Sequence, residues 1–364
     1  MQTPLTDFRT EFLDRLLDVV WRQWTALGVS GHGQKWWSSP IDPDALLLLS
    51  CTIARHDARL FDAVLEWLRI NGRFVNIQRV KRMLKDETFA GEPVLRAVAA
   101  ATSTSANEAK WARITRGGAK SRPQKEPLFF LKNGSALPVL HEPDPLFETY
   151  GFLRDRFEER GVAEPFRPEP LSNLLLRLRA LLGVNARCEI FQFLLLNGRG
   201  SPRAMAKDCY YFPATISKAL AEMSQSGFVV SRTEGRHRYY KLRPETWREL
   251  FVGTNPNTSW VVWASLFSAL EQVWLFLDQP HLVSQSALAQ ASSLRRILKR
   301  SVLSQLDRSG VVSMFGDDSA PSGEALIPFF VAHMRSALDW LEESSDLARD
   351  VQATPLSSRG RRST

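Results

Sequence analysis

The chain has 364 residues, 44% of them hydrophobic, so it is long enough to bury a substantial core and to form two or three domains. Its formal net charge is +8, a modest basic excess that favours phosphate-bearing partners. The three cysteines lack CxxC spacing, which argues against a disulfide framework and a structural zinc site. The N-terminus has no continuous apolar run followed by a cleavage site, which argues against export, so we expect a cytoplasmic protein.

The first 115 residues (1–115) are predicted to form a helical domain. Apolar residues recur there every three or four positions, which places them along one side of a helix. Asp42 followed by Pro43 is typical of a helix start, because the carboxylate caps free amides and proline tolerates the first helical position. Asn71-Gly72 is typical of a helix end.

The next segment, 116–170, is predicted to be a basic linker, a short hairpin and a connecting helix. Six basic residues and no acidic residue lie from Lys110 to Lys125, which is typical of a linker or a flexible arm. Asn133-Gly134 between two apolar runs predicts a β-hairpin or paired extended segments. Residues 144–160 are predicted to be helical, and the proline-rich stretch that follows marks a domain boundary.

Residues 251–350 are predicted to form a second helical domain that mediates dimerisation or binds a partner, followed by a disordered tail at 351–364. The apolar stretch 260–278 carries Glu271 and Gln272 near its middle, so we do not expect it to span a membrane. Its aromatic and aliphatic residues step by three and four, which predicts a seam that packs in its own domain or against a second subunit. The residues of this seam are Trp260, Trp263, Phe267, Leu270, Trp274 and Leu277.

The central segment, 171–250, carries the pattern that points to function. It divides into four helices followed by two strands that meet at a glycine turn. The predicted helices are Asn173 to Leu182, Ala186 to Leu196, Ser201 to Lys207 and Pro213 to Ser226, and the strands are 228–233 and 237–242. Nine basic and four acidic residues lie between Ser201 and Arg248, which leaves five net positive charges in this small region.

In the last of these helices, 213–226, Ile216, Leu220 and Met223 fall on one side. The remaining positions are small or hydrogen-bonding, as a helix that enters the major groove of DNA requires. The turn between the strands is basic and is placed to reach phosphates or the minor groove. We predict DNA contact by Thr215, Ser217 and Lys218, by Arg236, His237 and Arg238 at the turn, and by Arg203 and Tyr211.

This order of elements resembles the winged helix-turn-helix domain of bacterial regulators of the ArsR and MarR type. The phrase ATISKALAEMSQSGFV is similar to their recognition helix and first wing strand. The resemblance covers about 75 residues and implies a mainly α protein whose helical N- and C-terminal domains flank a winged helix with a β-hairpin wing. The cysteine motif that senses metal in the ArsR group is absent, because Cys209 stands alone. Cys188 and Cys209 are therefore interpreted as small buried residues, and no metal or cofactor is expected.

The leading hypothesis is thus a homodimeric transcriptional repressor that reads double-stranded DNA. Two alternatives stay open for parts of this pattern. The basic hairpin residues are also explained by a solvated edge that discourages aggregation. A second basic stretch, 69–85, resembles the central segment around Asn197-Gly198-Arg199, and is either another helix-turn-helix-like unit or a chance similarity.

Other functional classes have less support in the sequence than DNA binding. The chain has no GxGxxG, GxxxxGK[ST], GxSxG or HExxH motif and its six histidines are scattered, so we do not expect an enzyme or catalytic residues. The segments DALLLLS and EWLRINGRFVNIQRVKRML distantly resemble antitoxin or regulator proteins of bacterial defence modules. That resemblance implies an alternative function: binding and neutralising a protein partner, a nucleotidyltransferase-like toxin, with or without autoregulation.

Overall fold

The computed structural model describes residues 4–30, 37, 39–104, 108–115, 125–244, 247–253, 258, 260–311 and 320–346. This part of the chain is mainly helical and contains two small two-stranded sheets. No helix within it is long and apolar enough to cross a membrane. Most of the predicted basic linker, at 116–124, and the predicted tail at 351–364 lie outside the described residues.

The N-terminal part of the chain is built from six helices within the described residues. Their bounds are α1 (Pro4–Ala26), α2 (Pro43–Ile53), α3 (Ala58–Asn71), α4 (Ile77–Asp86), α5 (Glu92–Ala101) and α6 (Glu108–Thr115). As predicted, Asp42 caps α2: its carboxylate accepts from the amides of Asp44 and Ala45 at 3.1 and 3.3 Å. The predicted end of α3 at Asn71 is also confirmed.

The following segment contains little helix. It forms β1 (Glu126–Pro127), α7 (Pro145–Thr149) and β2 (Phe152–Leu153), and β1 pairs with β2 in parallel. The predicted pairing around Gly134 is confirmed by an antiparallel bridge between Phe130 and Ala136. The predicted helix over 144–160 is wrong beyond Thr149, because Gly151 adopts a positive φ of 86° and the chain then extends beside β1.

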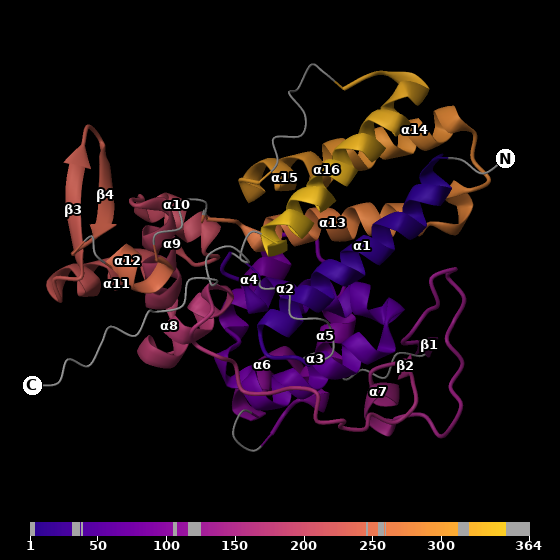
Figure 1. Cartoon of the computed structure of the whole chain (residues 1–364), viewed down its shortest axis with the longest axis horizontal. Coiled ribbons are helices and arrows are strands. Elements are labelled where there is room, and N and C mark those ends of the chain that lie inside the picture. The colour runs from indigo at the N-terminus through magenta and orange to yellow at the C-terminus, as the bar shows by residue number, and fades with distance from the viewer. Residues whose placement is uncertain are drawn as a thin grey trace, which may run out of the picture.

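The C-terminal helices return to pack on the N-terminal ones. They are α13 (Trp263–Leu277), α14 (Ala287–Ile297), α15 (Leu303–Ser309) and α16 (Leu326–Asp346), with a π-helical turn, Leu298–Val302, between α14 and α15. Figure 1 shows α13 and α16 beside α1, and α15 on the far side of α13 from α2; α13 contacts α1, α2 and α15. Except for the half-buried Trp260, the predicted seam of α13 is buried within this single chain.

Two hydrophobic cores hold the described chain together. The larger core combines side chains of α1–α6 with side chains of α13–α16, from Leu5 to Leu341. The separate N- and C-terminal helical domains expected from the sequence therefore share one core. The reason is that α13 is apolar on several sides, and α1 and α2 supply surfaces that cover it. The smaller core lies between Leu174 and Val252.

The central segment surrounds the smaller core, and each helix and strand predicted for it is present. The elements are α8 (Leu174–Leu182), α9 (Ala186–Asn197), α10 (Pro202–Asp208), α11 (Pro213–Gln225), β3 (Val229–Glu234), β4 (His237–Leu242) and then α12 (Trp247–Val252). Ser201 caps α10 by accepting from the amide of Ala204. The antiparallel hairpin β3–β4 projects at one end of the molecule, whereas α1 begins toward the opposite end (Figure 1).

Candidate nucleic-acid interface

Helix α11 has one buried side and one solvent-exposed side. Ile216, Leu220 and Met223 are buried in the smaller core, as their spacing predicted. The predicted contact residues Thr215, Ser217 and Lys218 are exposed, together with Ala214 and Ala221. The first acidic residue of the helix, Glu222, lies in its third turn and is paired with Arg187. The exposed side of the first two turns therefore carries one positive charge and no negative charge.

The hairpin β3–β4 presents its basic residues to solvent. Arg236, His237 and Arg238 are exposed at the turn, where Gly235 adopts a φ of +61°. Arg238 lies against Ser231, whose hydroxyl accepts from the Arg238 Nε at 2.9 Å. These residues are placed where a basic turn can contact phosphate.

The sequence prediction missed the outward side of this hairpin. Cross-strand pairing places Arg232 opposite Tyr239 and Val230 opposite Lys241, on the side that faces away from the buried Tyr240 and Leu242. The alternation of buried and exposed residues along β4 was the signal for this side. The outward side of the strands therefore adds Arg232 and Lys241 to the basic turn, while Glu234 on the same side pairs with Arg199 at 3.0 Å.

The two remaining predicted contact residues differ from each other. Arg203 is exposed on α10. The hydroxyl of Tyr211, in contrast, is engaged within the protein: it donates to Glu189 Oε2 at 3.0 Å and accepts from Asn76 Nδ2 at 2.6 Å. Burial raises the pKa of Tyr211 well above its usual value, with the charge of Glu189 adding to the effect. Tyr211 therefore joins α9 to the start of α4 and has no free hydroxyl for DNA.

The turn between α10 and α11 is attached to the helices of the larger core. Tyr210 adopts a φ of +60°, which is uncommon for a bulky residue and has to be compensated by its contacts. Its hydroxyl donates to Glu87 Oε1 at 2.5 Å, and Arg308 of α15 donates to the same oxygen at 2.7 Å. The start of α11 is therefore positioned by residues outside the central segment.

A buried ionic cluster makes the second connection between the two cores. The Arg179 guanidinium of α8 reaches Asp44 of α2 and Glu189 of α9, each at 2.6 Å. Arg79 of α4 pairs with Asp44 at 3.0 Å and with Asp42 at 2.5 Å. All five side chains are buried, and the planar guanidinium fork matches several carboxylate oxygens at once. The cluster fixes α8 and α9 against α2 and α4.

Three of the six basic residues of the stretch 69–85 form ion pairs with acidic residues of the same chain. Arg69 pairs with Glu159, Arg79 is buried in the ionic cluster, and Arg82 pairs with Asp86 at 2.5 Å. Lys81 and Lys85 are exposed on α4. The resemblance to the central segment therefore does not give α4 an exposed side as free of acids as that of α11.

The cysteines are packing residues. Cys188 and Cys209 are buried, as predicted, and so is Cys51. Burial raises the pKa of all three thiols. Within the described residues no group of three or more His, Cys, Asp or Glu side chains is arranged to hold a metal ion.

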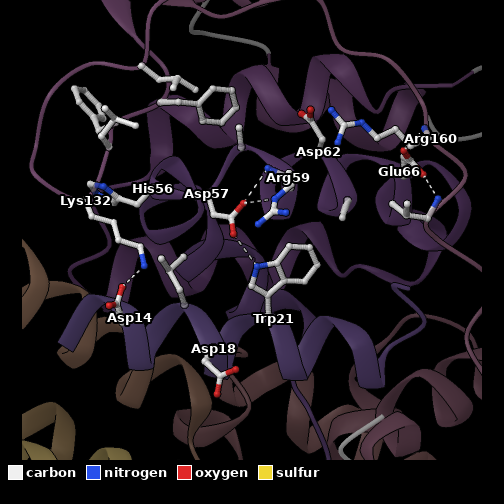
Figure 2. Close-up of a pocket in the computed structure, with 18 of the residues that line it drawn as sticks. Asp14, Asp18, Trp21, His56, Asp57, Arg59, Asp62, Glu66, Lys132 and Arg160 are labelled. Atoms are coloured by element: carbon white, nitrogen blue, oxygen red, sulfur yellow. Dashed lines mark hydrogen bonds and ion pairs between the residues drawn. The ribbon is translucent and has the colours of Figure 1, made fainter. Parts of the chain in front are cut away.

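A groove of about 750 Å³ lies between α1 and α3, and no sequence pattern predicted it. Figure 2 shows Asp14 and Asp18 on one side of the groove, with α1, and Asp57, Asp62 and Glu66 on the other, with α3. These carboxylates are engaged: Asp57 accepts from the Trp21 indole at 2.9 Å, Asp14 pairs with Lys132 at 2.5 Å, and Glu66 accepts from the amide of Val162 at 2.7 Å. The groove therefore presents carboxylates that stabilise the fold rather than a free general base.

Comparison of the chain with protein-family models, curated proteins and solved structures finds no match in any of the three. Its function is therefore inferred from its own residues. Three features bear on function: the exposed side of α11, the basic hairpin and the two connections to the larger core.

Proposed function

We propose that residues 171–250 form a winged helix-turn-helix that binds duplex DNA, with α11 in the major groove and the hairpin β3–β4 as the wing. The observation that carries this proposal is the exposed, acid-free side of α11, followed by a basic hairpin on the same segment. The major groove, about 12 Å wide, admits one helix whose exposed residues are small or hydrogen-bonding. Thr215, Ser217 and Lys218 supply such contacts, and Arg236 and Arg238 supply charge for the phosphates.

We further propose that the protein is a transcriptional regulator that acts as a repressor, by occupying its DNA site. A duplex site with two-fold symmetry is read by two copies of a recognition helix, so the proposal includes a homodimer. The α13 seam is buried in one chain and is not the surface for this. Apolar side chains at the outer edge of the smaller core are exposed instead, including Phe228, which stacks on Trp247 at 5.6 Å, and Leu250.

The test of DNA binding uses duplexes selected from genomic fragments and affinity measured at several salt concentrations. Lys218→Gln is expected to weaken binding, because a contact in the major groove is lost. Arg236→Gln is expected to weaken binding and to reduce the slope of log affinity against log salt by about one, because one phosphate contact is lost. Lys299→Gln removes the same charge from the π-helical turn after α14 and is expected to leave the affinity nearly unchanged. If no duplex binds more tightly than random DNA, the proposal is wrong.

A second candidate function is binding to another protein, such as a nucleotidyltransferase-like toxin. The exposed apolar residues Phe228 and Leu250 favour it, because apolar side chains that cluster on a surface mark contact sites. Co-expression with the product of a neighbouring gene, followed by light scattering, distinguishes a hetero-complex from a homodimer by mass. Leu250→Glu is expected to disrupt the complex that forms through this surface and to leave a monomer.

A further inference from the structure

A pocket of about 540 Å³ opens between the C-terminal half of α13 and the end of α14. Its base is apolar and includes Leu275, Phe276 and Ile297. Phe276 is only 2% exposed, so the base is a fixed surface of the larger core. A pocket of this volume is within the range that accepts a small organic molecule.

Two arginines line the opening of this pocket. Arg296 lies in the last turn of α14, and Arg300 follows one turn later in the π-helical turn Leu298–Val302. Both are exposed, and neither guanidinium makes a hydrogen bond or ion pair with another described residue. The neighbouring Arg295, in contrast, donates to the carbonyl of Pro321. Two like charges one turn apart repel each other, and an anion held between them relieves this repulsion.

The remaining lining residues are compatible with an anion. No acidic side chain lines the pocket among the residues that the structure describes, and Gln279 and Ser293 add uncharged hydrogen-bonding groups. A π-helical turn inside a helix is rare and often marks a functional site. Here it carries Arg300 beside Ser301, and both residues line the pocket.

We propose that this pocket binds a phosphate monoester with an apolar body. The two guanidinium groups match the two negative charges and the oxygens of the phosphate, and Leu275, Phe276 and Ile297 contact the body. The site lies among the C-terminal helices, and α14 is far from the hairpin β3–β4 in Figure 1. It is therefore distinct from the proposed DNA-binding surface, and it does not depend on DNA binding.

The test is calorimetric titration of the full chain with 1-naphthyl phosphate, using 1-naphthol and inorganic phosphate as comparison ligands. One molecule of 1-naphthyl phosphate is expected to bind per chain. Loss of the charge in 1-naphthol, or of the apolar body in inorganic phosphate, is expected to weaken binding by about tenfold or more.

Variants locate the binding to this pocket. Arg296→Gln and Arg300→Gln are each expected to weaken 1-naphthyl phosphate binding by about tenfold or more, because each removes a charged hydrogen-bond donor. Both side chains are exposed, so the melting temperature is expected to stay close to that of the unaltered chain. Lys299→Gln removes the same charge from the position between them, which does not line the pocket, and serves as the matched control. Equal affinity in all three variants, or binding of 1-naphthol as tight as that of the phosphate, would overturn the proposal.

Discussion

Arg179 illustrates how a single side chain connects distant parts of this fold. Its guanidinium is fully buried between α2 and α9 and donates to Asp44 and Glu189. Burial alone would raise the pKa of Asp44, but the charges of Arg179 and Arg79 outweigh it and hold that pKa below its usual value. The carboxylate therefore stays ionised, and the cluster depends on all of its members.

Replacement of Arg179 is expected to be strongly destabilising. Arg179→Ala leaves Asp44 and Glu189 with fewer partners in a buried site, so the free energy of unfolding is expected to fall by about 3–5 kcal/mol. Arg187→Ala is the matched control: its pair with Glu222 is about 40% exposed on both sides, and such pairs contribute about 0–1 kcal/mol. Urea unfolding followed by circular dichroism measures both. Equal losses in the two variants would contradict the role given to the buried cluster.

Glu271 is a buried carboxylic acid in the middle of α13, with 0% of its surface exposed. It accepts from the Thr52 hydroxyl and from the amide of Ala90. Burial raises its pKa from 4.5 to about 7, and these hydrogen bonds only partly oppose that effect. The folded protein therefore holds this proton more tightly than the unfolded chain does.

This shift predicts a pH dependence of stability. The contribution of Glu271 is fully present below about pH 4.5 and is lost as the pH rises to about 7, a change on the order of 3 kcal/mol. Glu271→Gln is neutral throughout, so the unfolding free energy of this variant relative to the unaltered chain is expected to rise between pH 5 and pH 8. Comparing the two chains cancels the contribution of His56. Burial lowers the pKa of His56 to about 4, so its contribution to stability rises between pH 4 and 6.5, opposite to that of Glu271. A difference that does not change with pH would refute the assignment.

Among the helices, α13 is the one for which the sequence did not show whether its apolar seam packs within its own chain or against a second subunit. Its seam is covered by α1, α2 and α15 of the same chain. Leu270→Ala is therefore expected to lower the free energy of unfolding by about 2–5 kcal/mol, by the same amount at low and high protein concentration. Leu288→Ala, at a 57% exposed position on α14, is expected to cost less than about 0.5 kcal/mol. A loss for Leu270→Ala that shrinks as the protein concentration rises would show that the seam belongs to a subunit interface instead.

Local signals predicted some elements well and others poorly. In α11 the spacing of Ile216, Leu220 and Met223 is a local signal within the helix, so its bounds were predicted closely. Residues 144–160 have a helical composition, but only five of them, Pro145–Thr149, are helical. There Arg154 pairs with Asp62 of α3 at 2.6 Å and the chain runs beside β1, which are contacts between residues far apart in sequence.

At the scale of the whole molecule, the larger core is made by both ends of the chain. A chain that ends at Gly253 lacks α13–α16, so α1 and α2 are expected to lose protection from amide hydrogen exchange. All buried residues of the smaller core remain in that fragment, which loses only Trp260 from its edge, and α9 and α11 are expected to retain more of their protection. Exchange measured by mass spectrometry on both chains tests this. Protection of α1 equal to that in the full chain would mean that the N-terminal helices form their own domain.

The two connections between the cores also bear on the proposed function. Tyr210 with Glu87, and Arg179 with Asp44, join the central segment to the rest of the chain on two sides. The orientation of α11 therefore depends on side chains that contact no DNA in the proposal. Only their distances in the folded chain identify these residues, because Glu87 lies more than a hundred positions before Tyr210 in the sequence.

Capping, glycine stops and apolar spacing act over a few neighbouring residues, so these patterns were enough to predict the helical character, the elements of the central segment and the exposed side of α11. Tertiary structure alone decided that α13 is enclosed by α1 and α2, that Tyr211 is engaged with Glu189 and Asn76, and that Arg296 and Arg300 border a pocket. The physical reason is that burial, ion pairing and pocket shape depend on which distant residues meet, and local patterns do not contain that information.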